Sequence, residues 1–169
     1  MYANRGTFMT LDEFNALSFD AARDAMQEVC GSEAWAVEMT AKRPFASLEG
    51  LKEGAEAQWW RLGEYGWLEA FRAHPATGAP DQRAAAISNA SPDLDPAVLD
   101  SIASLRRQYH ATFGFTFVFC AEGKTPEDVL EVLRDRIENR PEAEMTFAAE
   151  EQAKITQLRL DRLFTHEGT

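Results

Sequence analysis

The sequence lacks the short motifs that hold metals and nucleotides. It contains no CxxC pair, no HExxH helix motif, no Walker phosphate loop and no GxGxxG turn. Its three histidines, His74, His110 and His166, are scattered along the chain, so a histidine-rich metal site is not expected. These absences favour a protein whose chemistry runs without a metal or a nucleotide cofactor.

Cysteine, positive charge and long apolar runs are also scarce. Two cysteines, Cys30 and Cys120, indicate reduced thiols rather than a disulfide framework. No charged leader precedes an apolar core at the start of the chain, and no apolar run approaches the roughly 20 residues that span a bilayer. The 28 acids against 17 lysines and arginines give a net charge of −11, which repels nucleic acid phosphates. We therefore expect a cytoplasmic protein with neither a membrane nor a nucleic acid partner.

Helix start signals occur along most of the chain. The spacing of Thr10 and Glu13 is that of a capping box, and Thr125-Pro126 with two following acids combines a cap, a first-turn proline and first-turn negative charge. Further helices are expected from Ser18 to Cys30, from Ser32 to Arg43, from about Ser47 to His74 with a possible break, from Pro96 to Thr112, and from Pro141 to Phe164. A hydrophobic fraction of 45% in 169 residues fits one packed domain. The pattern predicts an all-α, single-domain bundle of about seven to nine helices over residues 1–169.

The run FGFTFVFCA at residues 113–121 is the one strongly β-like stretch. One strand cannot build a sheet, so we expect an extended segment buried among the helices. Its aromatic residues also suit an ordinary core. Its backbone groups nevertheless need partners, which side chains, water or a ligand could supply.

His74 is placed where a helix has to stop, because the ring of Pro75 disfavours helical geometry in the residue before it. A helix C-terminus favours the protonated imidazole, and histidine is a natural proton donor near neutrality. The dipeptide alone favours an ordinary histidine that ends a helix over a catalytic one. The turn-rich segment after it, up to Pro96, is expected to be irregular.

Arg159 falls within the apolar stripe of the last predicted helix, between Ile155 and Leu163. A guanidinium that faces the interior needs an anion. A fixed carboxylate of the protein and a carboxylate-bearing ligand, gripped by two parallel hydrogen bonds, both meet that need. The two alternatives stay open at this point.

Several stretches together resemble one family, the 2-oxo-4-hydroxy-4-carboxy-5-ureidoimidazoline (OHCU) decarboxylases of urate degradation. The resemblance covers nearly the whole chain and rests on EFNALSFDAARDAMQEVCGSEAWAVEM, RPF, WLEAFRAHPATG, YHATFGFTFVFCAEG and EEQAKITQLRL. It implies an all-helical lyase that needs no cofactor and forms a homodimer. It also implies the reaction of purine catabolism in which a ring carbon loses CO2 and is protonated on one face, giving (S)-allantoin.

The resemblance assigns roles to particular residues. It makes His74 the proton-transfer residue and Arg159 its catalytic companion near the ligand. These roles suit the chemistry, because a decarboxylation needs its carboxylate held and its developing carbanion protonated. The implied substrate-binding residues are Pro75, Ser88, Ser91, Pro92, Phe117, Val118, Phe119, Cys120 and Ala121, and no metal ligand is implied.

The chain departs from the family pattern after the His-Pro pair. The family carries Ser-x-x-Glu-Gln there, and the best register keeps Ser88 but places Ser91 and Pro92 where the glutamate and glutamine stand. That glutamate orients the histidine in the family and favours its protonated form. Three alternatives follow: a decarboxylase with a displaced acid, for which Asp93 and Asp95 are nearest, a relative acting on another ureido or imidazole acid, or a homologue that binds without turnover.

Overall fold

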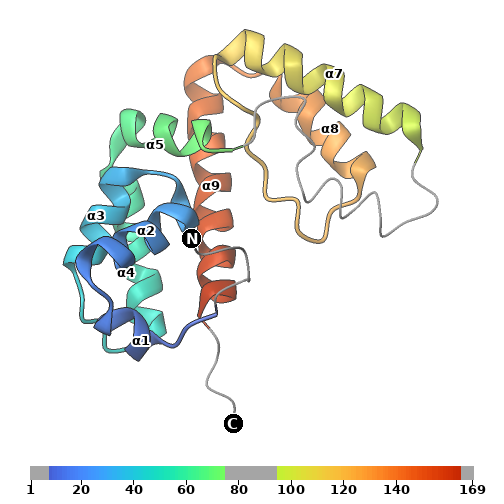
Figure 1. The fold of residues 1–169 in the computed structure, drawn as a ribbon. Helices are drawn as coiled ribbons and strands as arrows, with labels where there is room; N and C mark the ends of the chain where they lie inside the picture. Colours follow the sequence, from blue (N-terminus) through green and yellow to red (C-terminus); the bar gives the residue numbers. More distant parts are fainter. Residues whose placement is uncertain (1–7, 75–94, 165–169) are drawn as a thin grey trace. The chain divides into compact units, whose positions relative to one another are not determined.

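All regular structure in the described part of the chain, residues 8–74 and 95–164, is helical apart from one isolated bridge between Met9 and Phe164. The computed structural model contains eight helices there (Figure 1). They are α1 (Leu11–Ala16), α2 (Phe19–Cys30), α3 (Glu33–Ala41), α4 (Leu48–Arg61), α5 (Gly63–Arg72), α7 (Pro96–Phe113), α8 (Pro126–Arg136) and α9 (Pro141–Leu163). The predicted all-α class is confirmed, and the helix count lies within the expected range.

The predicted helix starts are confirmed at the level of individual hydrogen bonds. At α1 the Glu13 amide donates to the Thr10 hydroxyl at 3.2 Å, and the Thr10 amide donates to the Glu13 carboxylate at 2.7 Å. Thr125 and Asp128 form the same reciprocal pair at α8, which lowers the pKa of the Asp128 carboxyl. These contacts satisfy amides that the first helical turn leaves without partners.

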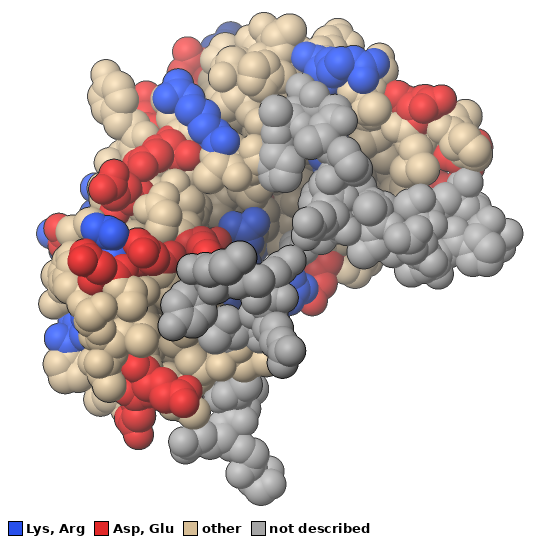
Figure 2. Space-filling model, viewed as in Figure 1, with Lys and Arg blue, Asp and Glu red and all other residues tan. Residues whose placement is uncertain are grey.

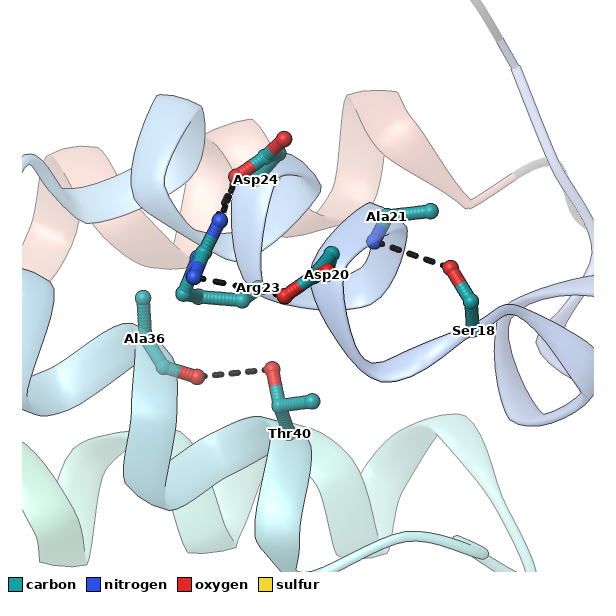
Figure 3. Close-up of polar contacts among 7 residues, drawn as sticks. All are labelled: Ser18, Asp20, Ala21, Arg23, Asp24, Ala36 and Thr40. Carbon is teal, nitrogen blue, oxygen red and sulfur yellow. Dashed lines mark hydrogen bonds and ion pairs between the residues drawn. The ribbon is translucent and has the colours of Figure 1, made fainter.

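Figure 3 shows the local polar contacts of α2 and α3. The Ser18 hydroxyl accepts from the Ala21 amide at 3.2 Å, and the Arg23 guanidinium lies between two carboxylates of its own helix. At the other end Gly31 has a φ of 86°, a left-handed conformation that a glycine adopts without steric cost. The sequence between residues 18 and 31 therefore specifies this helix locally at both ends.

The long helical region predicted up to His74 is broken into α4 and α5. The break comes at Leu62 and Gly63, and Gly63 has a φ of 69° that an α-helix cannot continue through. The separation lets the Trp67 indole of α5 donate to the Trp59 carbonyl of α4 at 3.0 Å. The possible break in this region is thus confirmed, and its cause is the left-handed glycine.

The chain divides into two compact units, and the first comprises residues 1–70 and 152–169. In its described part α2 packs against α3 and α3 against α4. The core contains the fully buried Trp35, whose indole donates to the Ala55 carbonyl at 2.9 Å. The last turns of α9 are tied to α4 by an ion pair of Lys52 and Asp161 at 2.6 Å.

The RPF triplet of the family resemblance has a structural role in this unit. Arg43 donates to the carbonyls of Phe14 and Leu17, both at 2.8 Å, and so supplies donors for the end of α1. Asn15 in turn binds the backbone amide and carbonyl of Phe45, both at 2.9 Å. The triplet therefore fastens the α3–α4 connection to α1.

The second unit comprises residues 71–151, and within it α7 packs against α8. The predicted extended segment lies here, and Phe115 to Val118 are buried. The Tyr109 ring lies 5.8 Å from the Phe115 ring and 5.3 Å from the Phe117 ring, so the segment is packed by aromatic contacts. The expectation of a buried segment without strand pairing over residues 113–121 is confirmed in part: Phe113 belongs to α7, Gly114 caps that helix, and residues 119–121 are half-buried. That the two units make up a single domain stays a prediction.

None of the described helices is long and apolar enough to cross a membrane. On the face that Figure 2 shows, basic side chains stand singly or in small groups between acidic ones, without a continuous basic stripe in the described part. Both cysteines are free, Cys30 buried and Cys120 half-buried, as reduced thiols require.

Candidate functional site

His74 follows the last turn of α5 in the second unit. The helix ends at Arg72, and the His74 amide donates to the Phe71 carbonyl at 3.3 Å, which closes that turn. The residue is half-buried. The predicted place of His74 at a helix end is therefore confirmed, and its role in proton transfer stays a prediction. His110, by contrast, is exposed on α7, and His166 lies outside the described residues.

Arg159 lies on α9 in the first unit and is half-buried. Its guanidinium donates to the Val29 carbonyl at 3.0 Å, which is one of the last carbonyls of α2. A cation is favoured there because the helix C-terminus carries partial negative charge. The hydrogen bond to this carbonyl fixes the direction of the guanidinium, and the role of Arg159 in ligand binding stays a prediction.

Cys30 is the residue that follows Val29, and it is 1% exposed. Burial raises the pKa of the Cys30 thiol to about 12, although a hydrogen bond from Thr156 and the charge of Arg159 act in the opposite direction. The thiol therefore stays protonated and uncharged near neutrality.

The segment Phe117 to Ala121 lies in the second unit. Some of its backbone amides and carbonyls form hydrogen bonds with other described residues, and others do not. The Val118 carbonyl accepts from the Arg136 guanidinium at 2.6 Å, and the Cys120 amide donates to the Glu151 carboxylate at 2.9 Å. The Ala121 carbonyl accepts from the Lys124 amide at 3.0 Å. In the described part of the chain, the amide and carbonyl of Phe119 take part in no hydrogen bond. Side chains therefore supply hydrogen-bond partners for the Val118 carbonyl and the Cys120 amide, as predicted for this segment, whereas the backbone groups of Phe119 have none among the residues that the structure describes.

A buried ionic cluster contacts this segment through Arg136. Glu144 is fully buried, and its carboxylate accepts from the Tyr109 hydroxyl at 2.5 Å, from Arg136 Nε at 2.6 Å and from Asn139 at 3.1 Å. The Arg136 guanidinium also lies 4.6 Å from the centre of the Phe117 ring. Burial and the hydrogen bond to Glu144 raise the pKa of the Tyr109 hydroxyl well above its ordinary value. The cluster therefore pairs a buried guanidinium with a buried carboxylate.

Several predicted site residues fall outside the described residues: Pro75, Ser88, Ser91 and Pro92, together with the alternative acid Asp93. Asp95, the other alternative acid, is described. Its carboxylate accepts from the Ala97 amide at 2.9 Å and caps α7. His74 and the extended segment belong to the second unit and Arg159 to the first, and each is described within its own unit.

Arg136 and Glu151, which form hydrogen bonds with the backbone of the extended segment, were not predicted from the sequence. Arg136 follows the buried Val129 and Leu133 of α8 by seven and three positions, so it lies on the same apolar face. The spacing test that singled out Arg159 would also have found Arg136. Glu144 and Glu151 carry no comparable local signal: Tyr109 lies 35 positions from Glu144, and Cys120 lies 31 positions from Glu151.

Comparison with known proteins gives a consistent result. A sequence model of the family described as OHCU decarboxylase matches residues 15–161. The chain is 32% identical to an Arabidopsis thaliana uric acid degradation bifunctional protein over 90% of this chain, and it spans 50% of that relative. It is 30% identical to the 2-oxo-4-hydroxy-4-carboxy-5-ureidoimidazoline decarboxylase of Amia calva, over 95% of this chain and 98% of that protein.

A solved structure has the same fold. It is a crystal structure of OHCU decarboxylase in the presence of (S)-allantoin, which is 34% identical, with a TM-score of 0.74 over 83% of this chain and 96% of that one.

Proposed function

Because this chain belongs to the OHCU decarboxylase family, we propose that it decarboxylates 2-oxo-4-hydroxy-4-carboxy-5-ureidoimidazoline to (S)-allantoin in urate degradation. The observation that carries the proposal is the extent of the match: His74, the segment Phe117 to Ala121 and Arg159 all lie inside residues 15–161. Each of them is also in a local setting that suits its assigned role. The proposed enzyme is a lyase that uses no cofactor.

Arg159 is proposed to hold the carboxylate of the substrate. The guanidinium is half-buried and donates to the Val29 carbonyl at the end of α2. Arginine binds carboxylates through two parallel hydrogen bonds, which fixes both position and orientation. Holding the group in one orientation aligns the carbon–carbon bond for cleavage.

His74 is proposed to supply the proton. When the bond to the carboxylate breaks, CO2 leaves and the electron pair passes into the ring, forming a double bond between the hydroxyl-bearing carbon and the neighbouring ureido-bearing carbon, while the displaced C=N electron pair goes to the ring nitrogen. A protonated imidazole at one face of the ring then gives its proton to the ureido-bearing carbon, and the hydroxyl proton passes to the ring nitrogen as that hydroxyl becomes the carbonyl of allantoin, so the product is a single enantiomer. Solvent then returns a proton to the imidazole, and the enzyme is ready for another turnover.

The test is the appearance of optically active allantoin. Urate is oxidised and the first hydrolytic step is supplied enzymatically, and circular dichroism then follows the product with and without this protein. We expect a faster rise of the signal with the protein, and no acceleration by His74→Ala at an unchanged melting temperature. A time course identical to the protein-free blank would refute the proposal.

The replaced Glu-Gln pair calls for a second measurement. Ser91 and Pro92 stand at these positions, so a protein that binds its ligand without turnover is the competing candidate. If that candidate is correct, the double change Ser91→Glu with Pro92→Gln creates activity in an inactive parent. If the parent is already active, a displaced carboxylate such as Asp93 or Asp95 performs the task, and changing that acid to asparagine abolishes the acceleration.

The homodimer implied by the family resemblance is part of the same proposal. Light scattering coupled to size exclusion measures it directly. A mass twice that of the chain's 18.9 kDa supports the dimer.

A further inference from the structure

The two edges of the extended segment differ in the hydrogen bonds that their backbone groups form. Val118 and Cys120 each have a backbone group held by a side chain, Arg136 at 2.6 Å and Glu151 at 2.9 Å. Phe119, which lies between them, has no backbone hydrogen bond in the part of the chain that the structure describes. Over residues 118–120, two residues whose backbone is held by a side chain therefore flank one whose backbone is not.

Extended backbone geometry explains this arrangement. Successive residues in an extended chain turn their amides and carbonyls to opposite edges, and residues two apart use the same edge. The rings of Phe117 and Phe119 stack at 5.9 Å, the relation expected of side chains two apart on one face. Val118 and Cys120 thus share the edge that the protein holds, and Phe119 points its backbone to the other edge.

The hydrogen bond from Arg136 to the Val118 carbonyl is well oriented, because several other contacts fix the Arg136 guanidinium. Arg136 is 7% exposed, donates from Nε to the Glu144 carboxylate at 2.6 Å and lies over the Phe117 ring. Glu144 is itself held by Tyr109 and Asn139. Buried ion pairs contribute little net stability compared with an apolar replacement, so orientation is the better reason for keeping this one.

We propose that Arg136 and Glu151 are positioning residues that lock one edge of the segment Phe117 to Ala121, so that the amide and carbonyl of Phe119 are presented to the substrate. One donor and one acceptor side by side complement the amide groups of a ureido acid. This inference rests on the proposed function, because it assumes that the open edge faces the substrate.

Glu151 provides the decisive variants, as it is half-buried. Glu151→Ala removes the acceptor for the Cys120 amide, and we expect KM to rise about tenfold, with a smaller change in kcat, since the hydrogen bond that holds this amide is lost. Glu151→Gln keeps an acceptor oxygen and restores most of the affinity. Glu150→Ala, an exposed neighbour on the same helix, is the matched control.

The kinetic outcomes separate positioning from a merely structural role. A destabilised but correctly arranged enzyme loses active fraction, which lowers kcat and leaves KM unchanged. A KM of Glu151→Ala equal to that of Glu150→Ala, or a Gln variant as impaired as the Ala variant, would overturn the proposal.

Amide hydrogen exchange, followed by NMR, makes the inference testable without turnover. The Cys120 amide is expected to exchange at least about tenfold faster in Glu151→Ala than in the wild type, with the amides of α7 and α8 unaffected. Addition of (S)-allantoin is expected to shift the Phe119 amide resonance more than that of Cys120. If the wild type makes no allantoin, the proposed function fails, and unchanged exchange at Cys120 would still refute the positioning role on its own.

Arg136 is tested by a double variant, because removing it alone leaves the buried Glu144 charge unpaired. Arg136→Met with Glu144→Gln removes both charges, and such replacements are commonly tolerated. We expect cooperative unfolding and a KM increase of about tenfold. A folded double variant with the wild-type KM would remove Arg136 from the proposal, and the Glu151 variants decide the case if the double variant does not fold.

Discussion

Two arginines on apolar helix faces have different surroundings. Arg136 of α8 is 7% exposed and meets the fully buried carboxylate of Glu144. Arg159 of α9 is half-buried and donates to the Val29 carbonyl at the end of α2. The counter-charge of Arg136 is thus part of the fold, whereas Arg159 is proposed to bind the carboxylate of the substrate.

The difference shows what helical spacing can and cannot reveal. Spacing identifies both arginines as inward-facing and requires an anion for each. The exposed fraction and the hydrogen-bond partners then distinguish the two residues. Arg136 binds the backbone of the extended segment, and Arg159 is proposed to bind the substrate. Each prediction below changes one side of this comparison.

The largest expected effect comes from removing the counter-charge of Arg136. Glu144→Ala leaves a buried guanidinium unpaired, and we expect the free energy of unfolding to fall by about 3–5 kcal/mol. Urea denaturation measures this loss, with the exposed Glu150→Ala as the matched control. A loss below about 1 kcal/mol would mean that the pair is solvated and that the contrast with Arg159 is false.

Changing Arg159 is expected to affect catalysis more than stability. Arg159→Ala removes the proposed carboxylate contact and lowers kcat/KM about 100-fold or more, while the free energy of unfolding changes by about 1 kcal/mol. Arg159→Lys keeps the charge and loses the two-pronged geometry, so it recovers only part of the activity. Equal kcat/KM values for the wild type and Arg159→Ala would show that Arg159 is a structural residue like Arg136.

Changing Tyr109, which shares the Glu144 carboxylate with Arg136, is expected to lower the free energy of unfolding by a smaller amount. Tyr109→Phe removes the hydroxyl that donates to Glu144 at 2.5 Å, and hydrogen bonds to charged groups contribute about 2 kcal/mol. Thermal and urea unfolding measure the loss. Tyr65→Phe serves as the control, since Tyr65 is 92% exposed and its change should leave stability unaltered.

The smallest predicted effect concerns the thiol beside Arg159 and depends on pH. The pKa of Cys30 is raised from 9.0 to about 12 in the folded protein, so the unfolded chain loses this proton first as the pH rises. The contribution of Cys30 to stability is therefore complete below pH 9 and is lost between pH 9 and 12. By pH 10 the loss is about 1.4 kcal/mol.

The Cys30 prediction is checked by comparing wild type and Cys30→Ala in urea at several pH values. Subtraction of the two curves isolates Cys30 from the tyrosines and lysines that titrate in the same range. Cys120→Ala, a change at the half-buried cysteine, should keep the wild-type pH dependence. Parallel curves for wild type and Cys30→Ala from pH 8 to about 10 would contradict the buried, protonated thiol.

Much of the fold was predictable because its signals are local. Thr10 with Glu13, and Thr125 with Asp128, are three positions apart and form their capping bonds as expected. Gly31 ends α2 for an equally local reason. The family resemblance pointed to His74, Arg159 and the extended segment, and the helix end at His74 agrees with it.

The supporting residues could not be predicted in the same way. Arg136 was detectable from its spacing on α8, yet nothing near it in the sequence names Glu144 or Val118 as its partners. Glu151 looks like one of many helix-surface acids until its carboxylate is seen on the Cys120 amide. Long-range pairs of this kind depend on how the helices pack.

The sequence by itself determined where the helices begin and end, the all-α class, the family, and the candidate residues His74 and Arg159. Each of these follows from residues a few positions apart or from the order of motifs along the chain. Only the tertiary structure decided that Arg136 is neutralised by Glu144, that Arg159 meets the end of α2, and that one edge of the extended segment is already occupied. The physical reason is that burial and charge pairing are properties of the packed state, in which groups more than thirty positions apart, such as Tyr109 and Glu144, share a single hydrogen bond.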